Sequence, residues 1–154
     1  KNLFKLIEDT YDGFRDVANS NNLRIRHYGS RDKLSKKILL IIDEVTNSTK
    51  RNSGTCINLM FNYGSRQEIK DAIIKIKETE KKYYNFRDYL YCPDSSDPDL
   101  IIRTGGEQRL SNFLLWQSAY TELYFTKTLW PEFNHMKLSY ALNKYFERVR
   151  KYGK

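Results

Sequence analysis

The sequence lacks the residue patterns that mark disulfide-rich and zinc-binding proteins. It has only two cysteines, Cys56 in an apolar run and Cys92 before a proline. Two cysteines do not make a disulfide framework, and their spacing suits no zinc site, so we expect a reduced, cytoplasmic setting. The two histidines, His27 and His135, lie far apart and form no metal-ligand pattern, and we assign them no role.

Long apolar runs are also missing. No stretch approaches the roughly 18 residues that a membrane-spanning helix needs, and no secretory signal is visible. Internal repeats, low-complexity segments and convincing linkers are absent, so the 154 residues amount to one domain with a real core. The chain begins without methionine, inside an expected helix, which suggests a fragment or an incompletely covered polypeptide.

Positive charge is what the chain has in excess. Its formal net charge is +8 and its pI is near 9.4, which favours an anionic partner. Phosphorylated small molecules, nucleic acid and an acidic membrane surface all remain open at this point. A hydrophobic content of 40% with 14% aromatic residues argues against disorder.

Apolar side chains at helical spacing predict several helices. One spans residues 3–19. The next is capped by Ser30 and has a buried stripe that ends at Val45. Another starts near Arg66, with Ser65 and Glu68 at capping-box spacing, and its expected buried residues are Ile69, Ile73 and Ile76. Shorter helices are expected over 83–91 and 113–120, and a final helix runs from Leu138 to Arg150 with an apolar stripe.

Strand patterns lie between these helices. Residues 23–28 alternate in polarity, which is typical of a half-buried strand. The run from Cys56 to Phe61 is nearly continuous in its apolar character, as in a central parallel strand buried on both faces. Leu100 to Ile102 and Leu123 to Phe125 are short strands. This order predicts an α/β fold with a mainly parallel central sheet flanked by helices.

The stretch from Asp99 to Phe133 contains the residues that indicate a chemical function most directly. The strand that ends at Arg103 is followed by Gly105 and Gly106, which allow a sharp turn. Arg109, Ser111 and Asn112 come just beyond. Two guanidiniums, exposed amides and a hydroxyl suit a diphosphate. The alternative is that Arg103 and Arg109 are surface cations paired with Glu107 or Asp99.

The same stretch carries a long motif. Residues 102–117 read IRTGGEQRLSNFLLWQ, and Tyr120, Glu122 and the sequence WPEF at 130–133 follow at fixed distances. This pattern resembles the C-terminal signature of the cis-prenyltransferases, the undecaprenyl diphosphate synthase family. Residues 22–29 and 58–66 resemble strands of that family more loosely, so the resemblance covers essentially the whole chain.

The resemblance implies roles for individual residues. Arg103, Arg109 and Ser111, with the Gly105–Gly106 turn, would hold the diphosphate of isopentenyl diphosphate. Glu122 would be a magnesium ligand, because Mg²⁺ prefers oxygen ligands. By sequence pattern alone, Glu122 is instead a partly exposed glutamate facing Lys127.

Expectations also follow for other positions. Gln108 stands where some family members have a histidine, and glutamine cannot act as an acid near neutral pH. Glu107 could orient either arginine or simply balance charge.

The aromatics Trp116, Tyr120, Tyr124 and Trp130 fit a core or a dimer interface better than base stacking. Leu3, Leu6 and Ile7 match positions that line the family's tunnel for the growing prenyl chain, with ordinary core packing as the alternative. Lys151 to Gly153 falls where some members have Arg-x-Gly.

One family segment does not occur. Members begin with a strand leading to an Asp-Gly-Asn-Gly-Arg-Trp run, whose aspartate holds magnesium and whose turn binds the allylic diphosphate. None of that is present, so we expect residues 1–154 to be the C-terminal portion of a single cis-prenyltransferase domain, incomplete at its N-terminus and inactive alone. No catalytic residue is assigned within it.

The complete protein would condense isopentenyl diphosphate with an allylic prenyl diphosphate to give a cis-polyprenyl diphosphate, the precursor of a lipid carrier for cell-wall synthesis. The resemblance further implies a Mg²⁺ cofactor, a homodimer, no nucleic-acid partner, and a cytoplasmic location at the inner face of the membrane through the lipid product. The alternatives are a non-catalytic partner subunit of such a synthase and a basic nucleic-acid-binding module.

Overall fold

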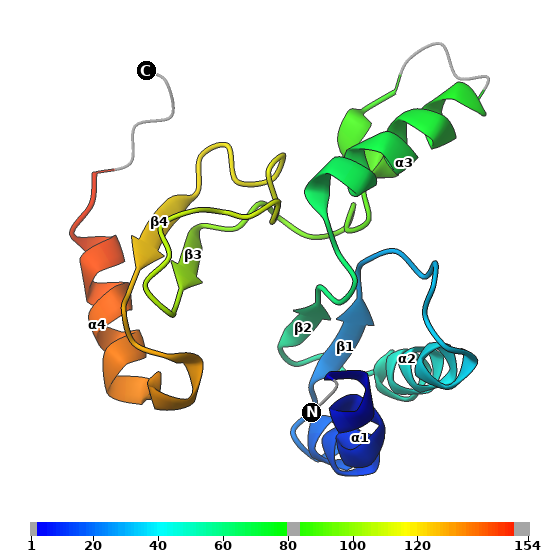
Figure 1. Ribbon diagram of the computed structural model, residues 1–154, viewed down its shortest axis with the longest axis horizontal. Coiled ribbons are helices and arrows are strands. Elements are labelled where there is room, and N and C mark those ends of the chain that lie inside the picture. Colours follow the sequence, from blue (N-terminus) through cyan, green and yellow to red (C-terminus); the bar gives the residue numbers. More distant parts are fainter. Residues whose placement is uncertain (1–2, 80–83, 150–154) are drawn as a thin grey trace. The chain divides into compact units, whose positions relative to one another are not determined.

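The computed structural model describes residues 3–79 and 84–149, with side chains from Tyr11 onward except that of Asp12. The chain divides into two compact units, unit 1 over residues 1–92 and unit 2 over residues 93–154 (Figure 1). None of the helices in the described ranges is long and apolar enough to cross a membrane.

Both units combine helices with a pair of parallel strands. Unit 1 contains α1 (Leu3–Ser20), β1 (Arg24–His27), α2 (Lys36–Thr49), β2 (Cys56–Leu59), α3 (Ser65–Lys77) and the 3-10 helix η1 (Phe86–Tyr89). Unit 2 contains β3 (Leu100–Arg103), β4 (Glu122–Phe125), the 3-10 helix η2 (Trp130–Glu132) and α4 (His135–Phe146). β1 pairs with β2 and β3 pairs with β4, both in parallel. The prediction of an α/β fold with parallel strands is confirmed.

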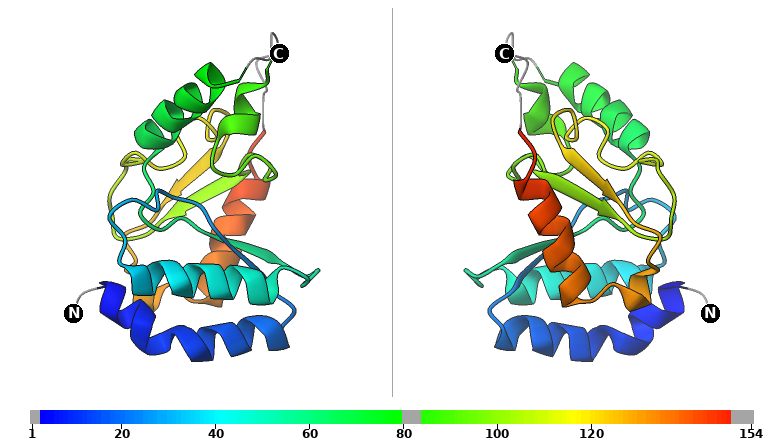
Figure 2. Two further views of the ribbon diagram at one scale, coloured as in Figure 1. Left: turned by 90° about the vertical axis from the view of Figure 1, so that its right-hand side faces the viewer. Right: turned by 90° about the vertical axis from the view of Figure 1, so that its left-hand side faces the viewer.

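The core of unit 1 lies between its two long helices and its strand pair. Ile25 of β1 stands opposite Ile57 of β2. Ala18 of α1 and Val45 of α2 pack with Ile25 in one buried cluster, and Ile57 lies against it. α1 and α2 therefore lie side by side on the same face of the strand pair (Figures 1 and 2). The alternating residues that predicted β1 and the apolar stripe that ended at Val45 thus supply side chains to this core.

A single buried hydroxyl joins α2 to β1. Thr49, the last residue of α2, is fully buried. Its Oγ1 donates to the Val45 carbonyl at 2.8 Å and accepts the Ile25 N–H at 3.0 Å. A buried N–H without a partner is costly. The Thr49 side chain supplies that partner for the Ile25 amide, at the point where β1 enters the core.

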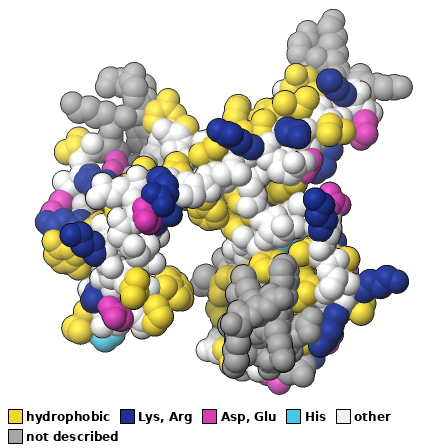
Figure 3. Space-filling view, in the orientation of Figure 1, with side chains coloured by type: hydrophobic (Ala, Val, Ile, Leu, Met, Phe, Trp, Pro, Cys, Tyr) yellow, Lys and Arg dark blue, Asp and Glu magenta, His cyan; other side chains and the backbone are white. Residues whose placement is uncertain are grey.

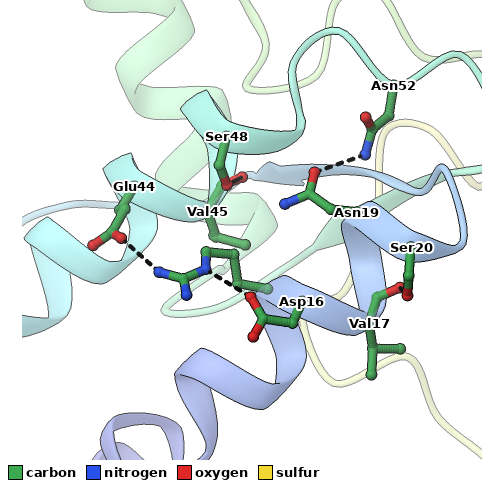
Figure 4. Close-up of polar contacts among 9 residues, drawn as sticks. Asp16, Val17, Asn19, Ser20, Glu44, Val45, Ser48 and Asn52 are labelled. Atoms are coloured by element: carbon green, nitrogen blue, oxygen red, sulfur yellow. Dashed lines mark hydrogen bonds and ion pairs between the residues drawn. The ribbon is translucent and has the colours of Figure 1, made fainter.

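Polar contacts tie the solvent edges of α1 and α2 together. In Figure 4, Glu44 of α2 and Asp16 of α1 receive hydrogen bonds from the same guanidinium, which belongs to Arg15. At the C-terminal end of α1, Asn52 donates to the Asn19 side chain at 3.2 Å and to the Leu23 carbonyl at 2.7 Å. These contacts fix the turn between α1 and β1 against the loop after α2.

The start of α2 differs from the sequence expectation. Ser35, not Ser30, is its N-cap, and the Ser35 Oγ accepts the Ile38 N–H at 3.2 Å. Ser30 instead lies in a turn where its Oγ accepts the Asp32 N–H at 3.1 Å. Both serines have spacing compatible with a cap. The loop after β2 decides between them, because the Ser30 N–H donates to the Asn62 carbonyl and so holds Ser30 outside the helix.

The buried face of α3 was also wrongly predicted. The helix begins at Ser65, with Gly64 as an N-cap that makes no side-chain hydrogen bond. Its buried residues are Ser65, Glu68 and Ala72, whereas Ile73 is 44% exposed. The buried Glu68 sets the orientation of α3, so the helix does not bury the face that carries its isoleucines.

β2 is not the doubly buried strand that its apolar run predicted. Within the part of unit 1 that the structure describes, it pairs with β1 alone, and its residues Cys56, Asn58 and Leu59 are exposed. A continuous apolar run shows that both faces of a strand could be buried. In this unit, only one face of β2 packs against the layer formed by α1 and α2.

Unit 2 corrects two further expectations. Residues 113–120 form successive turns rather than a helix, since Ser111, Asn112 and Leu114 all have left-handed φ angles. α4 ends at Phe146, and of its expected apolar stripe only Ala141 is buried. Exposed hydrophobic side chains over α4 are visible in Figure 3.

Replacing Thr49 with valine should lower the free energy of unfolding by about 1–3 kcal/mol. The substitution preserves shape but leaves the buried Ile25 N–H without its acceptor. Ser48→Ala is the matched control, because the Ser48 hydroxyl also donates to the Val45 carbonyl but accepts no buried amide; it should change stability by less than about 0.5 kcal/mol. Urea unfolding of both variants measures the difference. Equal losses would contradict the role given to Thr49.

Candidate functional site

The loop after β3 begins with the two glycines. Gly105 and Gly106 have φ angles of 90° and 86°, values that only glycine adopts without strain. Their N–H groups donate to the carbonyls of Thr128 at 2.8 Å and Thr126 at 2.9 Å. The sequence predicted exposed amides at this turn, and these two amides instead bind the segment after β4. The glycines therefore shape the loop without offering their N–H groups to a ligand.

Arg103 and Ser111 meet across this loop. Arg103 is the last residue of β3, and its Nη1 donates to the Ser111 Oγ at 3.0 Å and also to the Arg109 carbonyl. The structure thus brings together two of the residues predicted to bind diphosphate. It places them at the carboxyl end of a parallel strand, where α/β sheets bind their ligands.

The backbone beside Ser111 is strained. Ser111, Asn112 and Leu114 have φ angles of 47°, 64° and 46°. Left-handed conformations are uncommon for residues other than glycine, and they concentrate at ligand-binding and active sites. Three such residues in four positions make this loop a candidate binding segment of unit 2. The expectation that Asn112 is a turn residue agrees with its φ angle.

Arg109 lies on the outer side of the loop. Its guanidinium forms an ion pair with Glu107, and its side chain is 62% exposed. The alternative in which an arginine of this loop pairs with Glu107 therefore holds for Arg109. An exposed ion pair contributes only about 0–1 kcal/mol, so an anionic ligand can replace the carboxylate at little cost.

Two lysines add positive charge close to the loop. The Lys127 side chain lies near Gly106, as a methyl group added at that glycine would sit 3.9 Å from the Lys127 Cγ. Lys137 of α4 donates through its Nζ to the Thr128 Oγ1 at 3.2 Å. Cations from the loop, from the segment after β4 and from α4 thus surround one edge of unit 2.

Glu122 lies at the opposite end of the strand pair. It is the first residue of β4 and stands opposite Leu100, whereas Arg103 stands opposite Phe125. Three residues of strand correspond to about 10 Å. The structure does not bring Glu122 into contact with Arg103, and a shared ligand would have to extend between them.

The Glu122 carboxylate already has a cationic partner. Arg148 donates to Glu122 Oε2 at 2.5 Å and to the Leu123 carbonyl at 3.2 Å, and the glutamate side chain is 25% exposed. The sequence pattern had named Lys127 as the alternative partner, and the structure assigns Arg148 instead. Sequence reasoning missed Arg148 because nothing in its neighbourhood distinguishes it from other surface arginines.

The residues present fit a magnesium ion only as a partial ligand set. Across the described residues, no three His, Cys, Asp or Glu side chains gather closely enough to hold a metal. Mg²⁺ in phosphate-transfer sites commonly takes one or two carboxylates, substrate phosphates and waters. Glu122 can supply one such oxygen ligand once Arg148 releases it.

Unit 1 holds an apolar cavity of about 380 Å³ between α1, α2 and the strand pair. Its lining includes Phe14 of α1, Ile42 of α2 and Leu59 of β2. His27 also lines it, and its Nε2 lies 2.9 Å from the Phe61 carbonyl oxygen. Burial lowers the pKa of His27, which favours the neutral ring in this apolar surrounding.

This cavity bears on the tunnel expected from the resemblance. α1, the helix that carries the residues named for the tunnel, contributes to the wall of this cavity together with β2. The side chains of Leu3, Leu6 and Ile7 lie outside the described residues, as do Lys151 to Gly153. Their predicted roles therefore stay predictions.

The remaining predicted residues are mostly exposed. Gln108 lies in the loop between the arginines and is exposed. Trp116, Tyr120 and Trp130 are exposed as well, Trp130 by 76%, so the prediction that they belong to a core is wrong for this chain. A dimer interface remains the prediction for them.

Comparison with known proteins agrees with the motif. A family model described as putative undecaprenyl diphosphate synthase matches residues 1–153. The isoprenyl transferase of Thermotoga maritima is 43% identical over 98% of this chain and 68% of that protein. The isoprenyl transferase of Aquifex aeolicus is 41% identical over 100% of this chain and 68% of that protein.

Solved structures show the same fold. A probable undecaprenyl diphosphate synthase from Campylobacter jejuni has a TM-score of 0.87 and 35% identity, over 98% of this chain and 73% of that one. Lavandulyl diphosphate synthase from Lavandula x intermedia, in complex with dimethylallyl diphosphate, has a TM-score of 0.90 and 30% identity, over 97% and 69%. The strained arginine–serine loop, the family model and these relatives agree, and the chain belongs to the cis-prenyltransferase family of undecaprenyl diphosphate synthases.

Proposed function

We propose that this chain forms the isopentenyl diphosphate half of a cis-prenyltransferase site. The family is one of prenyl-transferring enzymes. The complete protein would condense isopentenyl diphosphate with an allylic prenyl diphosphate to give a cis-polyprenyl diphosphate. Homodimerisation and membrane association through the lipid product stay predictions.

The contact between Arg103 and Ser111 carries the proposal. It pairs a guanidinium with a hydroxyl at 3.0 Å on a strained loop at the carboxyl end of β3. A guanidinium forms charge-assisted, bidentate hydrogen bonds with phosphate, and a serine hydroxyl adds another donor. Arg109 can turn from Glu107 to the same anion, because its ion pair is exposed.

The chemistry assigns these residues a binding role. In the condensation, the allylic carbon–oxygen bond breaks and its diphosphate leaves. A carbon–carbon bond forms to isopentenyl diphosphate, which loses a proton as the cis double bond forms. Arg103, Arg109 and Ser111 hold the diphosphate that remains on the product. Gln108 can donate a hydrogen bond there but cannot transfer the proton.

Magnesium belongs to the same proposal. Bound Mg²⁺ would neutralise charge on diphosphate oxygens. Glu122 would be its ligand from this chain, and Arg148 would hold that carboxylate until the ion binds. The apolar cavity of unit 1 would take the hydrocarbon of the prenyl chain, because its lining is almost entirely aliphatic and aromatic.

Arg103→Ala should weaken isopentenyl diphosphate binding about tenfold or more, since it removes the charge-assisted hydrogen bonds. Isothermal titration calorimetry of the purified chain measures the change. Arg51→Ala is the matched control, because it removes the same charge from an exposed position outside the loop. Equal weakening by both variants would show attraction by net charge alone, and absence of binding by the wild-type chain would refute the site.

Glu122→Gln should abolish any strengthening of isopentenyl diphosphate binding by Mg²⁺. Glutamine keeps the shape of the side chain but is a poor ligand for a hard cation. The same calorimetry with and without Mg²⁺ tests this, with Glu132→Gln as a control at an exposed acidic position of unit 2. An unchanged Mg²⁺ effect in Glu122→Gln would remove Glu122 from the metal site.

The purified chain starting at Lys1 should form no polyprenyl diphosphate. It does not contain the Asp-Gly-Asn-Gly-Arg-Trp run that holds magnesium and the allylic diphosphate in the family. The assay combines labelled isopentenyl diphosphate, an allylic prenyl diphosphate and Mg²⁺, followed by extraction of the lipid product. Sustained product formation by a chain whose N-terminus is verified by mass spectrometry would overturn this prediction.

A further inference from the structure

The most deeply buried carboxylate of the described residues belongs to Glu68, in the first turn of α3. The side chain has no solvent exposure. Burying an unpaired carboxylate is very costly, so a glutamate in this position must be held by hydrogen bonds. The helix N-terminus also favours a negative charge there.

Two donors from different parts of unit 1 meet this carboxylate. The Tyr63 hydroxyl donates to Glu68 Oε2 at 2.5 Å, and the Tyr91 N–H donates to Glu68 Oε1 at 2.9 Å. Tyr63 lies in the loop after β2, and Tyr91 lies beyond η1. The rings of the two tyrosines are in edge contact, with centroids 6.2 Å apart. One side chain therefore joins three segments.

The loop that Tyr63 belongs to is built into the edge of the strand pair. Asn62 has a left-handed φ of 51°, and its Nδ2 donates to the carbonyls of Ser30 at 2.8 Å and Asp32 at 3.1 Å. Gly29 packs so closely on this loop that a methyl group there would sit 2.0 Å from the Phe61 carbonyl oxygen. The loops after β1 and β2 are thus locked together at the carboxyl ends of their strands.

The segment that contains Tyr91 closes the other side. Leu90 and Cys92 are buried on either side of it. The Tyr91 hydroxyl donates to Asp71 of α3, and the Lys75 ammonium lies 5.8 Å from the ring centroid. Glu68 holds the backbone of this segment, whereas Asp71 holds only its side chain.

We propose that Glu68 is a positioning residue, which fixes the loop of residues 62–66 at the carboxyl edge of the β1–β2 pair by binding Tyr63 and the backbone of Tyr91. Its effect on catalysis rests on the proposed function, under which the prenyl chain occupies the apolar cavity of unit 1, whose lining includes Phe61 directly before this loop. The hydrogen-bonded junction itself can be tested without that function.

The first test is spectroscopic. Burial, with the hydrogen bond to Glu68 as the next contribution, raises the pKa of Tyr63, and burial with Asp71 raises that of Tyr91. Both titrations are followed by NMR in the chain labelled with carbon-13 at tyrosine Cζ, with Tyr63→Phe assigning the signal. Glu68→Gln should lower the pKa of Tyr63. Asp71→Asn, the matched control one turn along α3, should lower the pKa of Tyr91 and leave Tyr63 unchanged.

The second test is kinetic and uses the full-length natural polypeptide. Glu68→Gln should lower kcat/KM about tenfold or more, because small displacements of a substrate-positioning loop have effects of that size. Asp71→Asn should change it less than twofold. Assays at a temperature well below the melting temperature of each variant separate this effect from loss of folded enzyme.

The outcomes distinguish the two claims. An unchanged Tyr63 titration in Glu68→Gln would refute the junction. A shifted titration with unchanged kcat/KM would limit Glu68 to stabilising the fold and overturn its positioning role. A shifted titration in a full-length protein that transfers no prenyl group would refute the proposed function while leaving the junction intact.

Discussion

The hydrogen bonds from the two glycine amides hold the loop after β3 against the segment after β4. Gly105 donates to the Thr128 carbonyl and Gly106 to the Thr126 carbonyl, so the chain leaves the parallel register of β3 with β4 at this point. The loop then passes through the left-handed conformations of Ser111 and Asn112, and Ser111 lies beside Arg103. Under the proposed function, this glycine-rich turn positions side chains, rather than its own amides, toward the anion.

This arrangement explains why the arginines differ. Arg103 belongs to a strand and is fixed by two acceptors, the Ser111 hydroxyl and the Arg109 carbonyl. Arg109 belongs to the exposed part of the loop and pairs with a glutamate. Arg103, which is held by two acceptors, and the exposed Arg109 together suit a charged ligand that binds and dissociates. Glu122 lies at the other strand end and is held by Arg148, so binding a metal there requires an exchange of partners.

The sequence predicted the positions of the helices and strands better than it predicted which of their residues are buried. Hydrophobic periodicity located α1, β1 and α2, and the short apolar runs located β3 and β4, because these patterns reflect local packing. It failed at α3, where the isoleucines define an apolar face but the buried Glu68 decides the orientation through Tyr63 and Tyr91. It failed again at residues 113–120, where three left-handed residues prevent a helix. The motif singled out Arg103 and Ser111, which the structure brings into contact, whereas the partners Arg148 and Thr128 depend on strand register, which the sequence does not show.

The central claim is that the loop after β3 binds the diphosphate of isopentenyl diphosphate. The most direct measurement is a titration of the nitrogen-15-labelled chain with isopentenyl diphosphate, followed by NMR of both the amides and the arginine side chains. The account predicts saturable shifts at the Arg103 side chain and at the amides of Ser111 and Asn112, with the Gly105 and Gly106 amides still protected from hydrogen exchange. Shifts spread evenly over the lysines and arginines of both units, or no shifts in this loop, would contradict it.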